Sequence, residues 1–122
     1  RGVLSDVTFA VRAAEGSDEL ATVGKAYTGL TDVEIAEMTR LLLDATVTDH
    51  GHYRSVRPEI VIEVAFDSVQ PSTRHRSGYA LRFPRIARWR HDKGVDDIDT
   101  LDRVRQIATA LVEQREQRVD QA

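Results

Sequence analysis

The sequence predicts one mainly β domain with two helices, one inserted among the strands and one at the C-terminal end. Three observations support this fold class. Several stretches alternate apolar and polar residues with a period of two, as half-buried strands do. Two other stretches repeat apolar residues every three or four positions, as amphipathic helices do. The 122 residues, 41% of them hydrophobic, suffice for a single domain over residues 1–122 with its own core.

The N-terminal part of the chain predicts a β-hairpin. Residues 6–13 carry Val or Phe at every second position in their central part, the pattern of a strand with one buried face. A turn-forming cluster, Glu15-Gly16-Ser17-Asp18, follows. Residues 19–27 are therefore expected to return as the second arm, which Thr28 and Gly29 end.

A helix is predicted to begin after Thr31. The threonine hydroxyl can accept a hydrogen bond from the amide of residue 34, and the Glu34 side chain can bond back to the Thr31 amide. Apolar residues then recur on one helical face, at Ile35, Met38, Leu42 and Ala45. The segment His50-Gly51-His52 is predicted to lie in the loop after this helix.

The second half of the chain predicts two long strands and a loop. Residues 59–69 are nearly continuous in β-branched and apolar residues, and Arg57-Pro58 ahead of them favours an extended entry. Residues 70–78 are polar and contain a proline and a glycine, which predicts a loop. Residues 79–89 alternate again, and Pro84 is expected to break the ladder at an edge or a bulge.

The last predicted element is an amphipathic helix. Asp99 and Thr100 precede apolar residues at helical spacing, namely Leu101, Val104, Ile107, Ala108, Leu111 and Val112. Residues 113–122 are polar and are expected to fray. The strands must close or be covered to hide their edges. An antiparallel barrel of the oligonucleotide/oligosaccharide-binding (OB) type does this if its first strand precedes Arg1, and the alternative is an open α+β sandwich.

The composition excludes several classes of function. Without cysteine, the chain has no disulfide framework, thiolate metal site or cysteine nucleophile, which suits a reducing compartment. No apolar run approaches the roughly 20 residues that cross a bilayer, so we expect no membrane partner and a cytoplasmic location. The chain begins at Arg1 without Met or a signal peptide, which indicates an excised domain or a fragment.

The net charge of −3 hides an uneven distribution of charged residues. Residues 70–94, the basic segment, hold seven cations and one acid, whereas the other 97 residues carry a net charge of −9. The cations are Arg74, Arg76, Arg82, Arg85, Arg88, Arg90 and Lys93. A concentrated positive segment in an otherwise acidic chain indicates an anionic partner.

The sequence contains no motif of independent catalysis, neither a Gly-rich phosphate loop nor Gly-x-Ser-x-Gly nor His-Glu-x-x-His. His50 and His52 lack a third metal ligand in view, so we expect no metal site. Glu63 lies inside an apolar run and requires a cationic partner if buried, for which Arg82 and Arg57 are the candidates.

The basic segment carries the strongest functional signal. On an extended chain Arg88 and Arg90 point to the same side, and Arg82 joins them unless a bulge intervenes. Guanidinium groups in a row give bidentate contacts to phosphate oxygens, and lysine adds a compact charge. Asp92 is expected to orient Arg90 or Lys93.

The order of residues in this segment resembles the sixth conserved motif of ATP-dependent DNA ligases, near the end of their C-terminal OB domain. The matching residues are Arg82-Phe83-Pro84-Arg85 and then Arg88, Arg90, Asp92 and Lys93. Residues 23–31 resemble the hairpin that leads into the inserted helix of that domain, and residues 6–11 resemble its second strand. Arg57-Pro58 and residues 63–66 resemble the strand before the basic loop. The resemblance covers nearly the whole chain and is closest to bacterial repair ligases.

The resemblance implies a role in a three-step reaction. A lysine is adenylated by ATP with Mg²⁺, AMP moves to a 5′-phosphate, and a 3′-hydroxyl then seals the nick in double-stranded DNA. Arg88, Arg90 and Lys93 would reach the β- and γ-phosphates of ATP when the domain closes over the nucleotidyltransferase domain of the same polypeptide. There they would stabilise the charge on the departing pyrophosphate. DNA repair, recombination and replication are the processes that such a ligase serves.

After adenylation, the resemblance implies that another face of the domain grips the nicked duplex. From charge and loop position, Lys25, Arg74 and Arg76 are our candidates for DNA-phosphate contacts. Arg82 and Arg85 serve either role or brace Glu63.

The family's nucleophile motif, Lys-x-Asp-Gly, is absent from these residues. The two lysines, Lys25 and Lys93, are followed by Ala26-Tyr27 and Gly94-Val95. The chain alone is therefore predicted to be inactive. We also expect it to be monomeric and to bind neither ATP nor Mg²⁺ tightly. Two alternatives stay open: a stand-alone OB module that binds single-stranded nucleic acid, and the related domain of an mRNA-capping enzyme. Trp89 could stack on a base in the first alternative, although a lone Trp in a strand is more often core.

Overall fold

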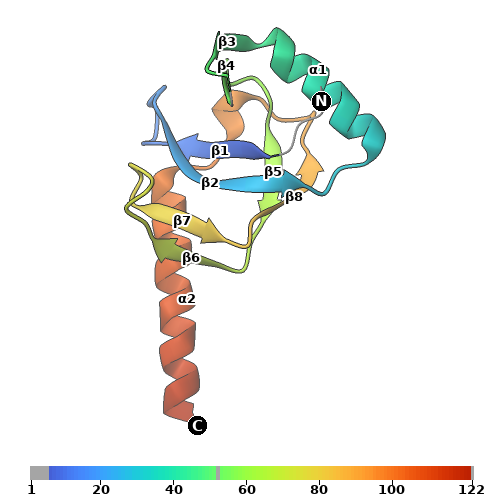
Figure 1. Cartoon of the computed structure of the whole chain (residues 1–122). Coiled ribbons are helices and arrows are strands. Elements are labelled where there is room, and N and C mark those ends of the chain that lie inside the picture. Colours follow the sequence, from blue (N-terminus) through green and yellow to red (C-terminus); the bar gives the residue numbers. More distant parts are fainter. Residues whose placement is uncertain (1–5, 52, 122) are drawn as a thin grey trace.

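The computed structural model describes residues 6–51 and 53–121, with the backbone alone at residues 27, 28 and 113–121. Figure 1 shows short strands gathered into one body, with a helix at the periphery and a long helix that extends away from it. The elements in chain order are β1 (Val7–Arg12), β2 (Leu20–Thr28), α1 (Asp32–Asp44), β3 (Thr46–Asp49), β4 (Arg54–Val56), β5 (Ile62–Ala65), β6 (Ser68–Pro71), β7 (Tyr79–Arg82), β8 (Arg85–Trp89), a 3-10 turn (Val95–Asp97) and α2 (Leu101–Gln121). The mainly β class with an inserted and a C-terminal helix is confirmed.

The strands form three small sheets. The largest has the order β1-β2-β8-β5, and β3–β4 and β6–β7 are two-stranded. The β1–β2 and β5–β8 pairs are antiparallel, as expected for an OB-type domain. The β2–β8 pair is parallel and short, with Tyr27 opposite Arg85 and Thr28 opposite Ile86. Among the described residues, hydrogen bonds between strands do not close these sheets into one ring.

The two long strands predicted in the second half of the chain each divide between two sheets. The strand predicted over residues 59–69 ends at Ala65, and β6 then pairs with β7 instead of β8. The Asp67 amide donates to the Arg82 carbonyl at 2.9 Å, which fixes this corner. The interruption expected at Pro84 is confirmed, because β7 ends at Arg82 and β8 begins at Arg85. The prediction of one uninterrupted strand over 59–69 was wrong because apolar continuity does not reveal a change of sheet.

The chain after α1 forms a hairpin that the sequence analysis did not predict, and His50 and Gly51 lie in its loop, as predicted. Strands β3 and β4 pair with Thr46 opposite Val56, and the Arg57 amide donates to the Ala45 carbonyl at 2.8 Å. His50 stacks on Tyr53 in the connection, with ring centroids 4.3 Å apart. His52 lies outside the described residues.

Helix α1 begins as its capping motif predicts. The Glu34 amide donates to the Thr31 hydroxyl at 3.2 Å, and the Thr31 amide donates to the Glu34 carboxylate at 3.1 Å. Met38 is 1% exposed and fixes the helix to the body of the domain. Val33, in the first turn of the helix, is by contrast 77% exposed.

The core lies where the start of α2 meets the strands. Val23, Leu101 and Val104 are its buried centre, and partly buried apolar side chains from β1, β2, β6 and β7 pack around them. The Arg12 amide donates to the Asp99 carbonyl at 2.9 Å, which ties the entry of α2 to β1. Neither helix has an apolar stretch of the length that a bilayer crossing requires within the described part of the chain. The expected fraying of residues 113–122 stays a prediction.

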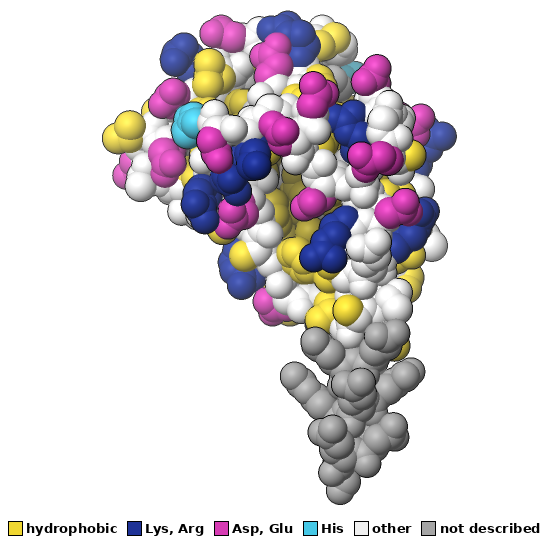
Figure 2. Space-filling model, turned by 180° about the vertical axis from the view of Figure 1, so that it is seen from behind, with side chains coloured by type: hydrophobic (Ala, Val, Ile, Leu, Met, Phe, Trp, Pro, Cys, Tyr) yellow, Lys and Arg dark blue, Asp and Glu magenta, His cyan; other side chains and the backbone are white. Residues whose placement is uncertain are grey.

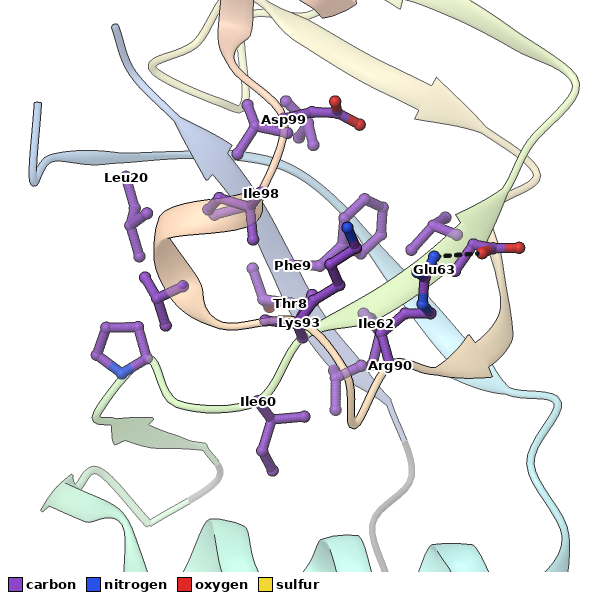
Figure 3. Close-up of a pocket in the computed structure, with 18 of the residues that line it drawn as sticks. Thr8, Phe9, Leu20, Ile60, Ile62, Glu63, Arg90, Lys93, Ile98 and Asp99 are labelled. Carbon is purple, nitrogen blue, oxygen red and sulfur yellow. Dashed lines mark hydrogen bonds and ion pairs between the residues drawn. The ribbon is translucent and has the colours of Figure 1, made fainter. Parts of the chain in front are cut away.

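A cleft of about 600 Å³ opens between β1 and β5. Its walls are mainly apolar and include Phe9, Ile60 and Ile62 (Figure 3). Met38 from α1 also lines it. Figure 2 shows hydrophobic side chains in a hollow bordered by charged side chains of both signs. The cleft lies along edges of β1 and β5 that no described strand covers, apart from the bridge between Arg12 and Thr100. The strand expected before Arg1 stays a prediction.

Candidate functional site

Strand β8 and the residue directly after it place Arg88 and Arg90 on one side of the sheet, where both reach Glu63. Glu63 lies on β5 directly opposite Arg88 in the antiparallel register. Its Oε2 is 3.4 Å from a terminal nitrogen of Arg88, and its Oε1 is 3.1 Å from a terminal nitrogen of Arg90. The two guanidinium groups therefore share one carboxylate, as strand alternation permits.

A second carboxylate holds Arg90 from the other side. Asp92 accepts two hydrogen bonds from the Arg90 guanidinium, each of 2.9 Å, from Nε and from one terminal nitrogen. The remaining terminal nitrogen donates to Glu63, so all three nitrogens of Arg90 are engaged. The side chain of Arg90 is 26% exposed, whereas that of Arg88 is 64% exposed. Arg90 is anchored, and Arg88 keeps donors free toward solvent.

The bidentate pairing of Arg90 with Asp92 shifts the pKa of both side chains. The hydrogen bonds from Arg90 hold the pKa of Asp92 well below its usual range, and those to Asp92 raise the pKa of Arg90 further. Because the pKa of Asp92 is lowered in the fold, the stabilisation from this pair is complete above the unfolded pKa of about 4. It is lost only as the pH falls through the lowered value. Asp92 is therefore ionised at neutral pH.

Lys93 continues the row of cations into the cleft. It follows the Arg90–Asp92 pair directly and lines the cleft together with Arg90. Figure 3 shows its side chain extending across the cleft toward Phe9. Lys93 is exposed, and no carboxylate among the described residues forms an ion pair with it. Its ammonium group is thus available to an anionic ligand.

Arg82 and Arg57 were predicted as the cationic partners of Glu63, and this prediction was wrong. Arg57 instead pairs with Glu59 at 3.0 Å. Arg82 lies on β7, which pairs with β6 rather than β5, and its guanidinium is 3.5 Å from the Gln70 amide oxygen. The break between β7 and β8 separates Arg82 from the row of Arg88 and Arg90. Arg85, also considered as a brace, pairs with Asp67 at 3.3 Å.

The candidate DNA-contacting residues lie on neighbouring elements. Arg74 and Arg76 are exposed on the loop between β6 and β7. This loop is tied to β2, because the Ser77 hydroxyl donates to the Thr22 carbonyl at 2.7 Å and the Thr22 hydroxyl lies 3.1 Å from His75 Nδ1. Lys25 is exposed on the same strand β2, while Arg82 and Arg85 are exposed at the β7–β8 turn.

Phe83 is a residue of interest to which the sequence analysis assigned no role. It is 61% exposed and has a φ of 54°, a left-handed backbone conformation that is uncommon outside glycine. The Arg82 guanidinium lies over its ring at 4.9 Å, and Arg85 donates to its carbonyl at 2.9 Å. An exposed ring between two arginines can stack on bases or sugars. The available signal was its position before Pro84, at the point where alternation breaks.

Trp89 lies in the core of the domain, and the histidines form no metal site within the described residues. Trp89 is 7% exposed and stacks on His91, with ring centroids 4.3 Å apart, so its ring belongs to the core. Within the described ranges, no three His, Asp or Glu side chains are grouped so that they could hold a metal ion.

A small β domain that presents a row of cations beside a basic loop has the charge pattern typical of domains that bind polyphosphates or nucleic acids. The chain matches the family described as ATP dependent DNA ligase C terminal region over residues 1–93. It therefore belongs to this family, and the resemblance drawn from its sequence is confirmed.

Named relatives agree with this membership. The chain is 61% identical over 110 residues to a probable DNA ligase of Opitutus terrae, covering 90% of this chain and 11% of that protein. It is 56% identical over 118 residues to a probable DNA ligase of Koribacter versatilis, covering 97% and 20%. A DNA ligase of Halorubrum lacusprofundi is 48% identical over 101 residues, covering 83% and 17%. The chain thus spans only a fifth or less of these relatives.

Proposed function

We propose that this chain is the OB-type domain of a DNA ligase that closes over a nucleotidyltransferase domain to orient the triphosphate of ATP, and later grips the nicked duplex. The observation that carries the proposal is the row of Arg88, Arg90 and Lys93 on β8 and the residues after it. Arg88 is 64% exposed, and Lys93 lines the cleft. Sealing of a nicked double strand during repair, replication or recombination is the activity proposed for the parent enzyme.

The donors of this site fit a triphosphate. Phosphate oxygens accept hydrogen bonds from guanidinium and ammonium groups, and Arg88 and Lys93 supply both kinds. Their charge would stabilise the negative charge that develops on the leaving pyrophosphate, and their positions would align it. Arg90 would act from between its two carboxylates as the fixed point of the row. Mg²⁺ would offset phosphate charge when bound, held by the nucleotide and by the rest of the parent enzyme.

The grip on DNA is proposed for the opposite end of β8 and for the loop between β6 and β7. Lys25, Arg74, Arg76, Arg82 and Arg85 would contact backbone phosphates, which position a protein on DNA without reading its sequence. Phe83, exposed between two of these arginines, would pack against sugars or bases.

The first test concerns the chain alone. We expect no covalent AMP adduct when this chain is incubated with labelled ATP and Mg²⁺, because neither of its two lysines stands in the nucleophile motif. Denaturing electrophoresis followed by detection of the label checks this. A stable adduct would show that the chain has a nucleophile of its own, and the proposed division of labour would be wrong.

The second test concerns the DNA grip. In the ligase that contains this chain, replacing Arg74 and Arg76 by Ala should weaken binding to nicked duplex. The slope of log Kd against log salt should fall by about 0.9 for each phosphate contact that is lost. Fluorescence anisotropy at several salt concentrations measures both effects. The matched control is Arg40→Ala, which removes an exposed arginine from α1, away from this face. An unchanged slope would contradict the assignment, and tighter binding to single strands would favour a stand-alone single-strand module.

A further inference from the structure

We propose that Glu63 is a positioning residue for the adenylation step, because it holds the Arg88 guanidinium in the orientation in which it meets the phosphates of ATP. This inference rests on the proposed function. Glu63 divides its carboxylate between two arginines, with Oε1 toward Arg90 and Oε2 toward Arg88. It stands directly opposite Arg88 across the β5–β8 pair.

The two arginines are held to different degrees. Arg90 is fixed by three hydrogen bonds to two carboxylates, so the Glu63 oxygen beside it is itself held in place. Arg88 is joined to Glu63 through one nitrogen at 3.4 Å and is 64% exposed. Arg88 is thus directed by Glu63 while its other nitrogens stay open to a ligand. The chain of contacts runs from Asp92 through Arg90 and Glu63 to Arg88.

Such a contact has a physical effect on phosphate binding. Arg88 and Arg90 are two residues apart on one strand face, about 7 Å between their Cα atoms, where like charges repel. A carboxylate between them offsets this repulsion. It also restricts the rotamers of Arg88 before ATP arrives, so less side-chain freedom is lost on binding. A guanidinium that is misplaced by about 1 Å in the transition state can slow a reaction about 100-fold.

The contact is not expected to support the fold itself. Glu63 and Arg88 are 39% and 64% exposed, and ion pairs at such positions contribute little to stability. Substitution of Glu63 also changes the contact to Arg90, but Arg90 keeps its two hydrogen bonds to Asp92. The substitution therefore separates positioning from folding. Glu59 provides the matched control, because it carries the same charge four residues earlier and pairs with Arg57, away from Arg88.

The experiment uses the full ligase that contains this chain, with the substitutions Glu63→Gln and Glu59→Gln. Single-turnover adenylation at varied ATP concentration and sealing of a pre-adenylated nick are measured separately. For Glu63→Gln we expect adenylation to slow about tenfold, with sealing changed by less than about twofold and an unchanged melting temperature. Glu59→Gln should leave both steps as they are. Equal loss in both steps, or the same loss from Glu59→Gln, would overturn the proposal.

Arg88→Ala distinguishes this inference from the proposed function. If Glu63 acts through Arg88, adding Glu63→Gln to Arg88→Ala should slow adenylation no further, because the group being positioned is gone. If Arg88→Ala alone does not affect adenylation, the role proposed for Arg88 in the parent reaction is wrong. If Arg88→Ala slows adenylation but Glu63→Gln does not, the proposed function stands and the role of Glu63 is refuted.

Discussion

Replacing Lys93 by Ala should slow adenylation of the parent ligase by about 10² to 10³-fold, the loss typical when one preorganised donor to developing charge is removed. Lys93 lies in the cleft beside Arg90, and no ion pair within the described residues occupies its ammonium group. Its removal therefore leaves no buried partner unpaired. The fall should appear in the rate of enzyme–AMP formation, which rapid quench with labelled ATP measures.

Sealing of a pre-adenylated nick is the internal control for this prediction. That step needs no triphosphate, so Lys93→Ala should leave it nearly unchanged. Arg90→Ala should act in the same direction, but it also leaves Glu63 and Asp92 without their shared cation, which complicates its interpretation. Equal loss of adenylation and sealing in Lys93→Ala would mean that Lys93 does not act on pyrophosphate.

Replacing Trp89 by Ala should reduce the free energy of unfolding by about 3–5 kcal/mol, a large part of the 5–15 kcal/mol typical of a domain. Trp89 is 7% exposed, stacks on His91 and pairs across the sheet with Ile62. Trp89 lies between Arg88 and Arg90 in the sequence, so its loss should also disorder the proposed phosphate site. Urea unfolding followed by circular dichroism measures the change.

Two comparisons make the stability prediction specific. Trp89→Phe keeps an aromatic ring in the core and should recover part of the loss, because it leaves a smaller cavity than Trp89→Ala. Val33→Ala removes apolar atoms from a side chain that is 77% exposed and should change stability by less than about 0.5 kcal/mol. A loss below about 1 kcal/mol in Trp89→Ala would mean that Trp89 is not part of the core as described.

Local signals in the sequence predicted the elements that depend on local chemistry. The capping motif at Thr31 placed the start of α1, and the alternation of residues 6–13 placed β1. Pro84 marked the end of one strand and the start of another. Alternation alone also predicted that Arg88 and Arg90 share a side of the strand. The structure confirms this, because both side chains reach Glu63.

Features that depend on pairing between distant segments could not be read from the sequence. Residues 59–69 are nearly continuous in apolar residues, and this pattern does not show that β5 pairs with β8 whereas β6 pairs with β7. Because the strand pairing was unknown, Glu63 was predicted to pair with Arg82 or Arg57, whereas it pairs with Arg88 and Arg90. The hairpin of β3 and β4 was missed because its strands are short and largely exposed.

Strand β8 has a mechanical consequence. Arg85, a candidate for contact with DNA, begins the strand, and Arg88, a candidate for contact with ATP, lies three residues further along it. At about 3.3 Å per residue, the two are about 10 Å apart on a strand that is paired on both sides. The pairing on both sides therefore keeps the distance between Arg85 and Arg88 fixed. In the proposed cycle, any rotation of the domain that carries one arginine toward its ligand would therefore move the other by a corresponding arc, because both lie on the same paired strand.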